Sequence, residues 1–77
     1  MNRIEQIKAR SLNIAMAVND RRTGEMAYEI GVSPQQLSVW RKYGNYSNKA
    51  TVLLMGVLKI DKYSDFIKLG ESISTLN

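Results

Sequence analysis

The sequence predicts an all-α fold, a compact bundle of about five helices around a central helical pair joined by a glycine corner. Apolar residues recur at helical spacing, for example at Ile4, Ile7 and Ile14 in the first segment. Residues that favour helix starts precede several apolar stripes, and glycines follow some of them. We expect one helical domain over residues 1–70 and a tail over 71–77 that either frays or joins an interface.

Composition restricts the classes of function. The chain has 77 residues, 44% of them hydrophobic, so it supports one modest core. It has no cysteine and no histidine, which excludes disulfides and thiolate metal sites and removes the commonest general base. It also has no glycine-rich phosphate loop and no carboxylate cluster. We therefore expect a protein that is not an enzyme, with no metal, no cofactor and no small-molecule substrate.

The charge balance bears on the partner and the location. Net charge is +4 and the pI is about 9.6, which favours an anionic partner but is also common among soluble proteins. No apolar run reaches the length of a membrane span, and the N-terminal region is charged. We expect no membrane partner, no signal peptide and a cytoplasmic location.

The first helix is expected to begin after Asn2, because Asn2 and Glu5 have the spacing of a capping box. Its apolar stripe continues to Val18, and the helix should end near Asn19 or Asp20. Three basic residues lie largely off this stripe and form either a solvated face or phosphate contacts: Arg3, Lys8 and Arg10.

The stretch from Thr23 to Lys42 has the spacing of a helix-turn-helix. Met26, Ala27 and Ile30 fall on one face of its first helix, and the small Ala27 allows a close crossing. At the corner, Gly31 tolerates a positive φ at no steric cost. Helical hairpins share some of this pattern, so a helical interaction domain is the alternative.

The second helix of this motif has a well-marked start. Ser33 is a good N-cap, Pro34 suits the first helical position, and Gln36 completes a capping-box spacing. Leu37 and Trp40 form its inward face, and Val32 covers the corner between the helices.

A helix in this position of the motif enters the DNA major groove, and its outward side chains read base edges. Glutamine bonds adenine, serine bonds several base edges, valine contacts the thymine methyl group, and lysine prefers guanine. The candidate base-reading residues are Gln35, Ser38, Val39 and Lys42.

Phosphate contacts are expected at the flanks of this helix and near the start of the helix before it, for which Thr23 is the expected N-cap. The candidates are Arg21, Arg22, Thr23, Ser33, Gln36, Arg41, Tyr43 and Lys49. For Arg21 and Arg22 a solubilising turn is an equal alternative. Tyr46 either reaches a phosphate or packs back on the domain.

The fourth helix, capped by Ser47 or Asn45 and running to Leu58, is apolar nearly all round. It is either a central core helix or part of a subunit interface. A short fifth helix is expected after a cap at Asp61, from about residue 62 to 69, ending at Gly70. The candidate oligomer-interface residues are Val52, Met55, Phe66 and Leu69.

The run from Ala27 to Leu58 resembles the DNA-binding domains of lambda repressor-like phage regulators of the Cro, CI and CII types. It is most similar to the lambda CII family. The shared features are Gly31-Val32, the pattern Gln36-x-Ser38-x-Trp40 followed by Arg41 and Lys42, and a leucine-rich helix over 51–58. The resemblance implies a helical domain that binds a double-stranded DNA operator as a homodimer or higher homo-oligomer, in a bacterial host cell.

The chain also differs from the CII pattern. It is shorter, lacks a long polar C-terminal tail, and has a different segment over residues 19–24. We therefore expect a Cro-like transcriptional repressor of a phage or prophage. The alternatives are a CII-like activator and a helical protein-interaction module that does not bind DNA.

Overall fold

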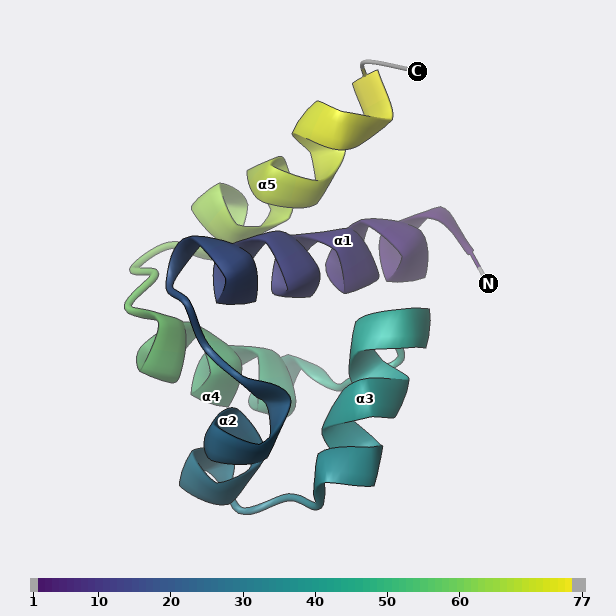
Figure 1. Cartoon of the computed structure of the whole chain (residues 1–77). Helices are drawn as coiled ribbons and strands as arrows, with labels where there is room; N and C mark the ends of the chain where they lie inside the picture. Colours follow the sequence, from purple (N-terminus) through teal and green to yellow (C-terminus); the bar gives the residue numbers. More distant parts are fainter. Residues whose placement is uncertain (1, 76–77) are drawn as a thin grey trace.

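The computed structural model describes residues 2–75, and this part of the chain forms five helices and no strand (Figure 1). The all-α prediction is therefore confirmed. The helices are α1 (Arg3–Val18), α2 (Thr23–Ile30), α3 (Pro34–Tyr43), α4 (Asn48–Leu58) and α5 (Tyr63–Thr75). None of these helices is both long and apolar enough to cross a membrane.

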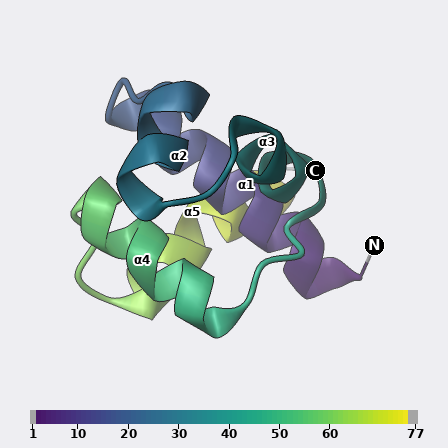
Figure 2. The same ribbon diagram turned by 90° about the horizontal axis from the view of Figure 1, so that it is seen from below.

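The first helix divides the molecule into two sides. α5 packs along one side of α1, while α2, α3 and α4 lie on the other (Figure 1). Seen from below, α2, α3 and α4 surround the lower face of α1 (Figure 2). Because α1 contacts both α5 and α3, it links the α2–α3 pair to the C-terminal helix.

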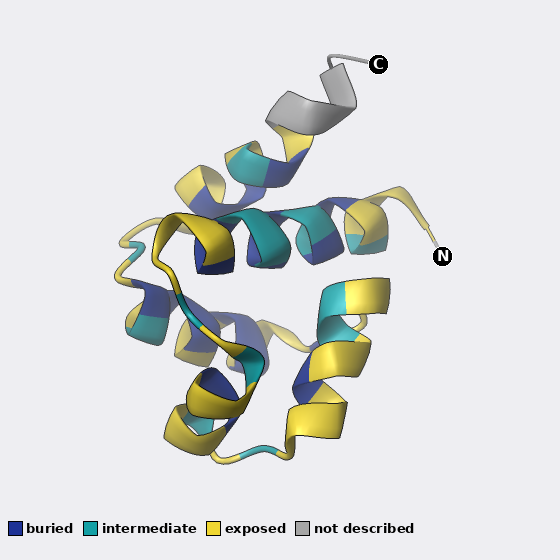
Figure 3. Ribbon diagram, viewed as in Figure 1, coloured by how far each residue is buried: buried dark blue, intermediate teal, exposed yellow. Residues whose placement is uncertain are grey.

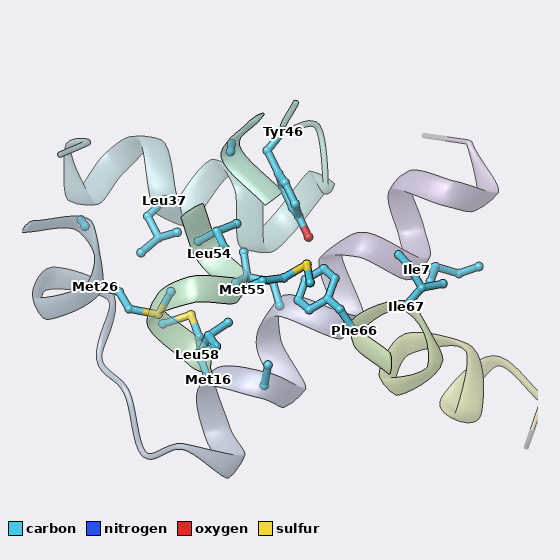
Figure 4. Close-up of a cluster of buried hydrophobic side chains, with 14 residues drawn as sticks. Ile7, Met16, Met26, Leu37, Tyr46, Leu54, Met55, Leu58, Phe66 and Ile67 are labelled. Carbon is cyan, nitrogen blue, oxygen red and sulfur yellow. The ribbon is translucent and has the colours of Figure 1, made fainter. Parts of the chain in front are cut away.

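A single apolar core runs between these two sides. Met26, Leu37 and Leu58 gather where α2, α3 and α4 meet, and Ile7 and Ile67 lie at the α1–α5 end (Figure 4). The buried faces point inward and the outer faces of α2 and α3 are exposed (Figure 3).

Most of the predicted caps are present. Asn2 and Glu5 form a reciprocal capping box, with bonds of 2.8 and 3.1 Å. The hydroxyls of Ser33 and Ser47 accept the amides three residues later, each at 3.1 Å. Gly31 ends α2 in the left-handed conformation, with φ of 77°. Local capping chemistry therefore fixes the starts of α1, α3 and α4.

Two predicted caps are wrong. Thr23 is the first residue of α2 and not its N-cap, since Arg22 holds that position without a side-chain bond. The Thr23 hydroxyl instead accepts a hydrogen bond from Arg41. α5 begins at Tyr63, and the Lys62 carbonyl accepts the amides of its first turn, so Asp61 lies outside the cap position.

The predicted end of the fifth helix at Gly70 is also wrong, because α5 continues through Gly70 to Thr75. Gly70 is buried against α1, where a Cβ would overlap the Ile7 carbonyl oxygen and lie 2.7 Å from the Ser11 hydroxyl. Ser11, fully buried, donates to the Ile67 carbonyl at 3.3 Å and accepts the Gly70 amide at 2.9 Å. The glycine allows close contact between two helices. Of the tail, Leu76 and the side chain of Ile73 lie outside the described residues.

Candidate nucleic-acid interface

α3 presents one polar face to solvent and one apolar face to the core. Gln35, Ser38 and Lys42 are exposed, and Val39 is 38% exposed. On the opposite face, Leu37 is fully buried and the Trp40 side chain packs against the core. The structure therefore brings the four candidate base-reading residues together on the free side of one helix (Figure 3).

Two backbone hydrogen bonds close the turn before α3. The Gly31 amide donates to the Tyr28 carbonyl at 3.3 Å, and the Val32 amide donates to the Ala27 carbonyl at 3.0 Å. Ala27 is fully buried where the two helices meet. The start of α3 is thus placed relative to α2 by a hydrogen-bonded turn of three residues.

Arg41 connects three helices. Its Nε donates to Asn13 Oδ1 of α1 at 2.6 Å, and its Nη1 donates to Thr23 Oγ1 of α2, also at 2.6 Å. Asn13 Nδ2 returns a bond to the Arg41 carbonyl at 2.9 Å. All these acceptors are neutral, and no carboxylate in the described part of the chain pairs with Arg41. These hydrogen bonds hold its guanidinium between α1, α2 and α3.

The other candidate phosphate contacts differ in their exposure and in the interactions that they already make. Arg21 forms an ion pair with Glu29, while Arg22 is exposed at the N-cap of α2. The Lys42 ammonium lies 5.3 Å from the centre of the Tyr43 ring, which is partly exposed. The remaining three candidates are exposed at the starts of α3 and α4: Ser33, Gln36 and Lys49.

Tyr46 packs back on the domain and does not reach outward. It is 3% exposed, and its hydroxyl donates to the Lys8 carbonyl at 2.8 Å. Lys8 Nζ donates to the Tyr46 carbonyl and lies 4.4 Å from the ring centre. Burial raises the pKa of the Tyr46 phenol, and burial lowers the pKa of Lys8 against the opposing effect of Glu5. No local sequence pattern indicates this pairing, because the two residues are 38 positions apart.

Two of the four candidate oligomer-interface residues are buried within the single chain. Phe66 is fully buried and Met55 is only 9% exposed, so both serve the core of one chain. Leu69 is a partly buried neighbour of that core. Val52 is 67% exposed and remains available to a second chain. Beside it lies a pocket of about 410 Å³, lined by Asn48, Thr51, Val52, Met55 and Tyr63.

Comparisons of the chain with protein-family models, with curated proteins and with solved structures found no match. No group of three or more acidic, histidine or cysteine side chains among the described residues is arranged to hold a metal ion. The function is therefore inferred from the geometry of α3 and the residues around it.

Proposed function

We propose that this protein is a sequence-specific DNA-binding transcriptional regulator that reads an operator with α3. The supporting observation is the division of α3 into a core face and a polar face. Leu37 anchors the helix, and Gln35, Ser38 and Lys42 stand free on the other side. Such a helix, placed by a hydrogen-bonded turn, has the shape and the donor and acceptor groups needed in a major groove.

The charge distribution supports the same proposal. The net charge is +4, with Arg22 at the N-cap of α2, Arg41 in the last turn of α3 and Lys49 in the first turn of α4. Neutralising phosphates with such residues supplies the sequence-independent part of DNA affinity. We propose a Cro-like repressor of a phage or prophage, acting in the bacterial cytoplasm, because repression requires only occupancy of a promoter.

We further propose that the operator is bound by a homodimer. The exposed apolar residues of α4, Val52 at 67% and Leu53 at 49%, support this assembly. A core built from a chain this short is also strengthened by a partner subunit. Sedimentation equilibrium at micromolar concentration, with and without DNA, tests this part, and a monomer under both conditions contradicts it.

The DNA proposal is tested by selecting binding sites from random duplexes and then comparing the selected and scrambled duplexes by fluorescence anisotropy at fixed salt. We expect tighter binding to the selected duplex. Equal affinity for the two duplexes contradicts sequence-specific regulation.

The base-reading role of α3 is tested by Gln35→Ala. We expect the preference for the selected duplex to fall by about tenfold, because one good base contact is worth on the order of 1–3 kcal/mol. Ser38→Ala should produce a smaller loss, and Ser64→Ala, an exposed serine on α5, should produce none. A Gln35→Ala protein that discriminates as well as the original contradicts the role assigned to this face.

A second function is favoured by a different surface. The pocket beside Val52 and the half-exposed Tyr63 form an apolar surface suited to a protein partner. If the chain is an interaction module without DNA binding, Gln35→Ala is silent and Val52→Asp abolishes partner binding. The salt dependence of DNA binding separates the two functions, since the module predicts none.

A further inference from the structure

A groove lies between α1 and the C-terminal turn of α3. It has a volume of about 230 Å³ and is lined by Gln6, Ala9, Arg10, Asn13, Arg41 and Lys42. Three of these six residues are cations, two carry amides, and none is a carboxylate. We call this site the α1–α3 groove. Its lining has the chemistry that binds an oxyanion.

The cations of the groove come from two helices whose relative position is fixed. Arg41 holds α3 to α1 through its reciprocal bonds with Asn13. Because the Arg41 side chain bonds only neutral acceptors within the described residues, its charge adds to those of Arg10 and Lys42. The groove is therefore lined by three cations from two helices that are bonded to each other.

The groove continues the proposed base-reading face. Lys42 lines the groove and also shares the exposed stripe of α3 with Gln35 and Ser38. α3 has ten residues and is therefore about 15 Å long, slightly more than the major-groove width of about 12 Å. When the N-terminal half of α3, which carries Gln35 and Ser38, reads base edges, the C-terminal end of the helix and the groove beside it approach the DNA backbone.

We propose that the α1–α3 groove binds one phosphodiester of the DNA backbone, an inference that rests on the proposed DNA-binding function. Arg10 donates to one non-bridging oxygen from the α1 wall. Lys42, at the C-terminal end of the exposed stripe of α3, donates to the other oxygen from the α3 wall and so contacts a phosphate and not a base. Arg41 adds positive charge from the groove wall while it holds α1 against α3. This contact makes α1 part of the DNA interface. It fixes the position of α3 along the groove and carries no sequence information itself.

The test is a methylphosphonate scan, in which one phosphate at a time of the selected duplex is made neutral. The scan is repeated with Arg10→Gln and with Lys62→Gln. Lys62 is exposed and directly precedes α5, the helix on the opposite side of α1 from α3 (Figure 1). Lys62→Gln therefore controls for the loss of one charge. We expect Arg10→Gln to weaken binding to the selected and the scrambled duplex equally, by about tenfold. It should also reduce the slope of log affinity against log salt by about 1.

The scan identifies the phosphate. One neutralised position should weaken binding by the original protein and by Lys62→Gln, and should have a smaller effect on Arg10→Gln, which retains Lys42 and Arg41 in the groove. If Arg10→Gln binds like the original protein, or if no neutralised position is coupled to Arg10, the groove does not hold a backbone phosphate. If the original protein shows no salt-dependent DNA binding, the proposed function fails first and this inference fails with it.

Two further measurements complete the test. Gln6→Glu places a negative charge at an exposed position of the groove wall. We expect it to lower DNA affinity while the circular dichroism spectrum stays that of the original protein. This variant keeps the proposal testable if Arg10→Gln does not fold. Inorganic phosphate is titrated at constant ionic strength and followed by NMR of the Ala9 and Asn13 amides. Saturable free-phosphate binding without any coupled backbone position in the scan overturns the assignment to DNA.

Discussion

The turn between α2 and α3 and the surface of α1 use glycine for different reasons. Gly31 has φ of 77°, and a Cβ added there meets nothing within 4 Å. Gly44 and Gly70 lie against α1, where a Cβ would overlap the carbonyl oxygens of Glu5 and Ile7 respectively. The first glycine is required by its own backbone conformation. The other two are required by a neighbouring helix, and Gly44 by its positive φ as well.

This difference shows how the molecule is held together. The α2–α3 turn is a local device that its own residues specify. α1, in contrast, is a central helix, and its backbone is approached closely by the end of α3 at Gly44 and by the middle of α5 at Gly70. Substitutions that add one methyl group distinguish the two situations, because they cost most where there is no room.

The largest expected effect is that of Gly44→Ala. Its Cβ would lie 2.8 Å from the Ala9 nitrogen as well as overlapping the Glu5 carbonyl, and its φ is 65°. We expect the free energy of unfolding to fall by about 3 kcal/mol or more, which combines overpacking with a left-handed backbone. Urea unfolding measures this change.

Gly31→Ala is the matched control, because it has the positive φ without the clash. We expect a loss of about 1 kcal/mol in the same urea experiment. If the two substitutions cost the same, the close approach of α1 at Gly44 contributes nothing and the comparison fails.

The next effect in size is that of Gly70→Ala in α5. Alanine favours a helix, but here its methyl group displaces the Ile7 carbonyl and the Ser11 hydroxyl that bonds the Gly70 amide. We expect a net loss of about 2 kcal/mol. Gly56→Ala in α4 has open space and should instead stabilise the protein by up to about 1 kcal/mol. A stabilising Gly70→Ala contradicts the tight α1–α5 contact.

A smaller effect than that of Gly70→Ala is expected for Tyr46→Phe, which removes the hydroxyl bonded to the Lys8 carbonyl. We expect a loss of about 1 kcal/mol near neutral pH. The buried phenol has a pKa raised above its ordinary value of 10.0, so above that pH the folded state holds more protons than the unfolded state. The free energy of unfolding therefore falls as pH rises through this range.

The pH dependence gives a second measurement on Tyr46→Phe. Since phenylalanine does not titrate, the stability difference between the original protein and Tyr46→Phe should shrink above about pH 10. The lowered pKa of Lys8 acts in the opposite direction, because below 10.5 the unfolded state binds the extra proton, but it is present in both proteins and cancels. A difference that stays constant up to pH 11 contradicts the buried phenol.

The sequence predicted the elements with strong local signals. The capping box at Asn2, the Ser33 cap and the Gly31 corner are set by neighbours within a few residues, so each was found where expected. The polar face of α3 also follows from helical spacing, because Leu37 identifies the buried side.

The sequence could not show contacts between distant segments. Gly70 looks like a helix end unless α1 is known to lie against it, and Ser11 looks like a break in an apolar stripe. Likewise, the sequence alone does not show whether Phe66 faces the core or solvent, because α1 packs against α5 from a distant part of the chain. Arg41 was expected to meet phosphate, and its bonds to Asn13 and Thr23 follow only from the crossing of three helices.

The single tryptophan of the sequence provides a natural optical probe of α3. Trp40 lies on the inner side of that helix with its ring centre 5.7 Å from that of the buried Tyr46, and the two rings are tilted by 47°. At this separation, excitation absorbed by the tyrosine passes to the indole. Fluorescence emission from this one residue therefore reports, without any label, whether α3 stays packed against the core when the protein is heated, brought to another pH or mixed with DNA.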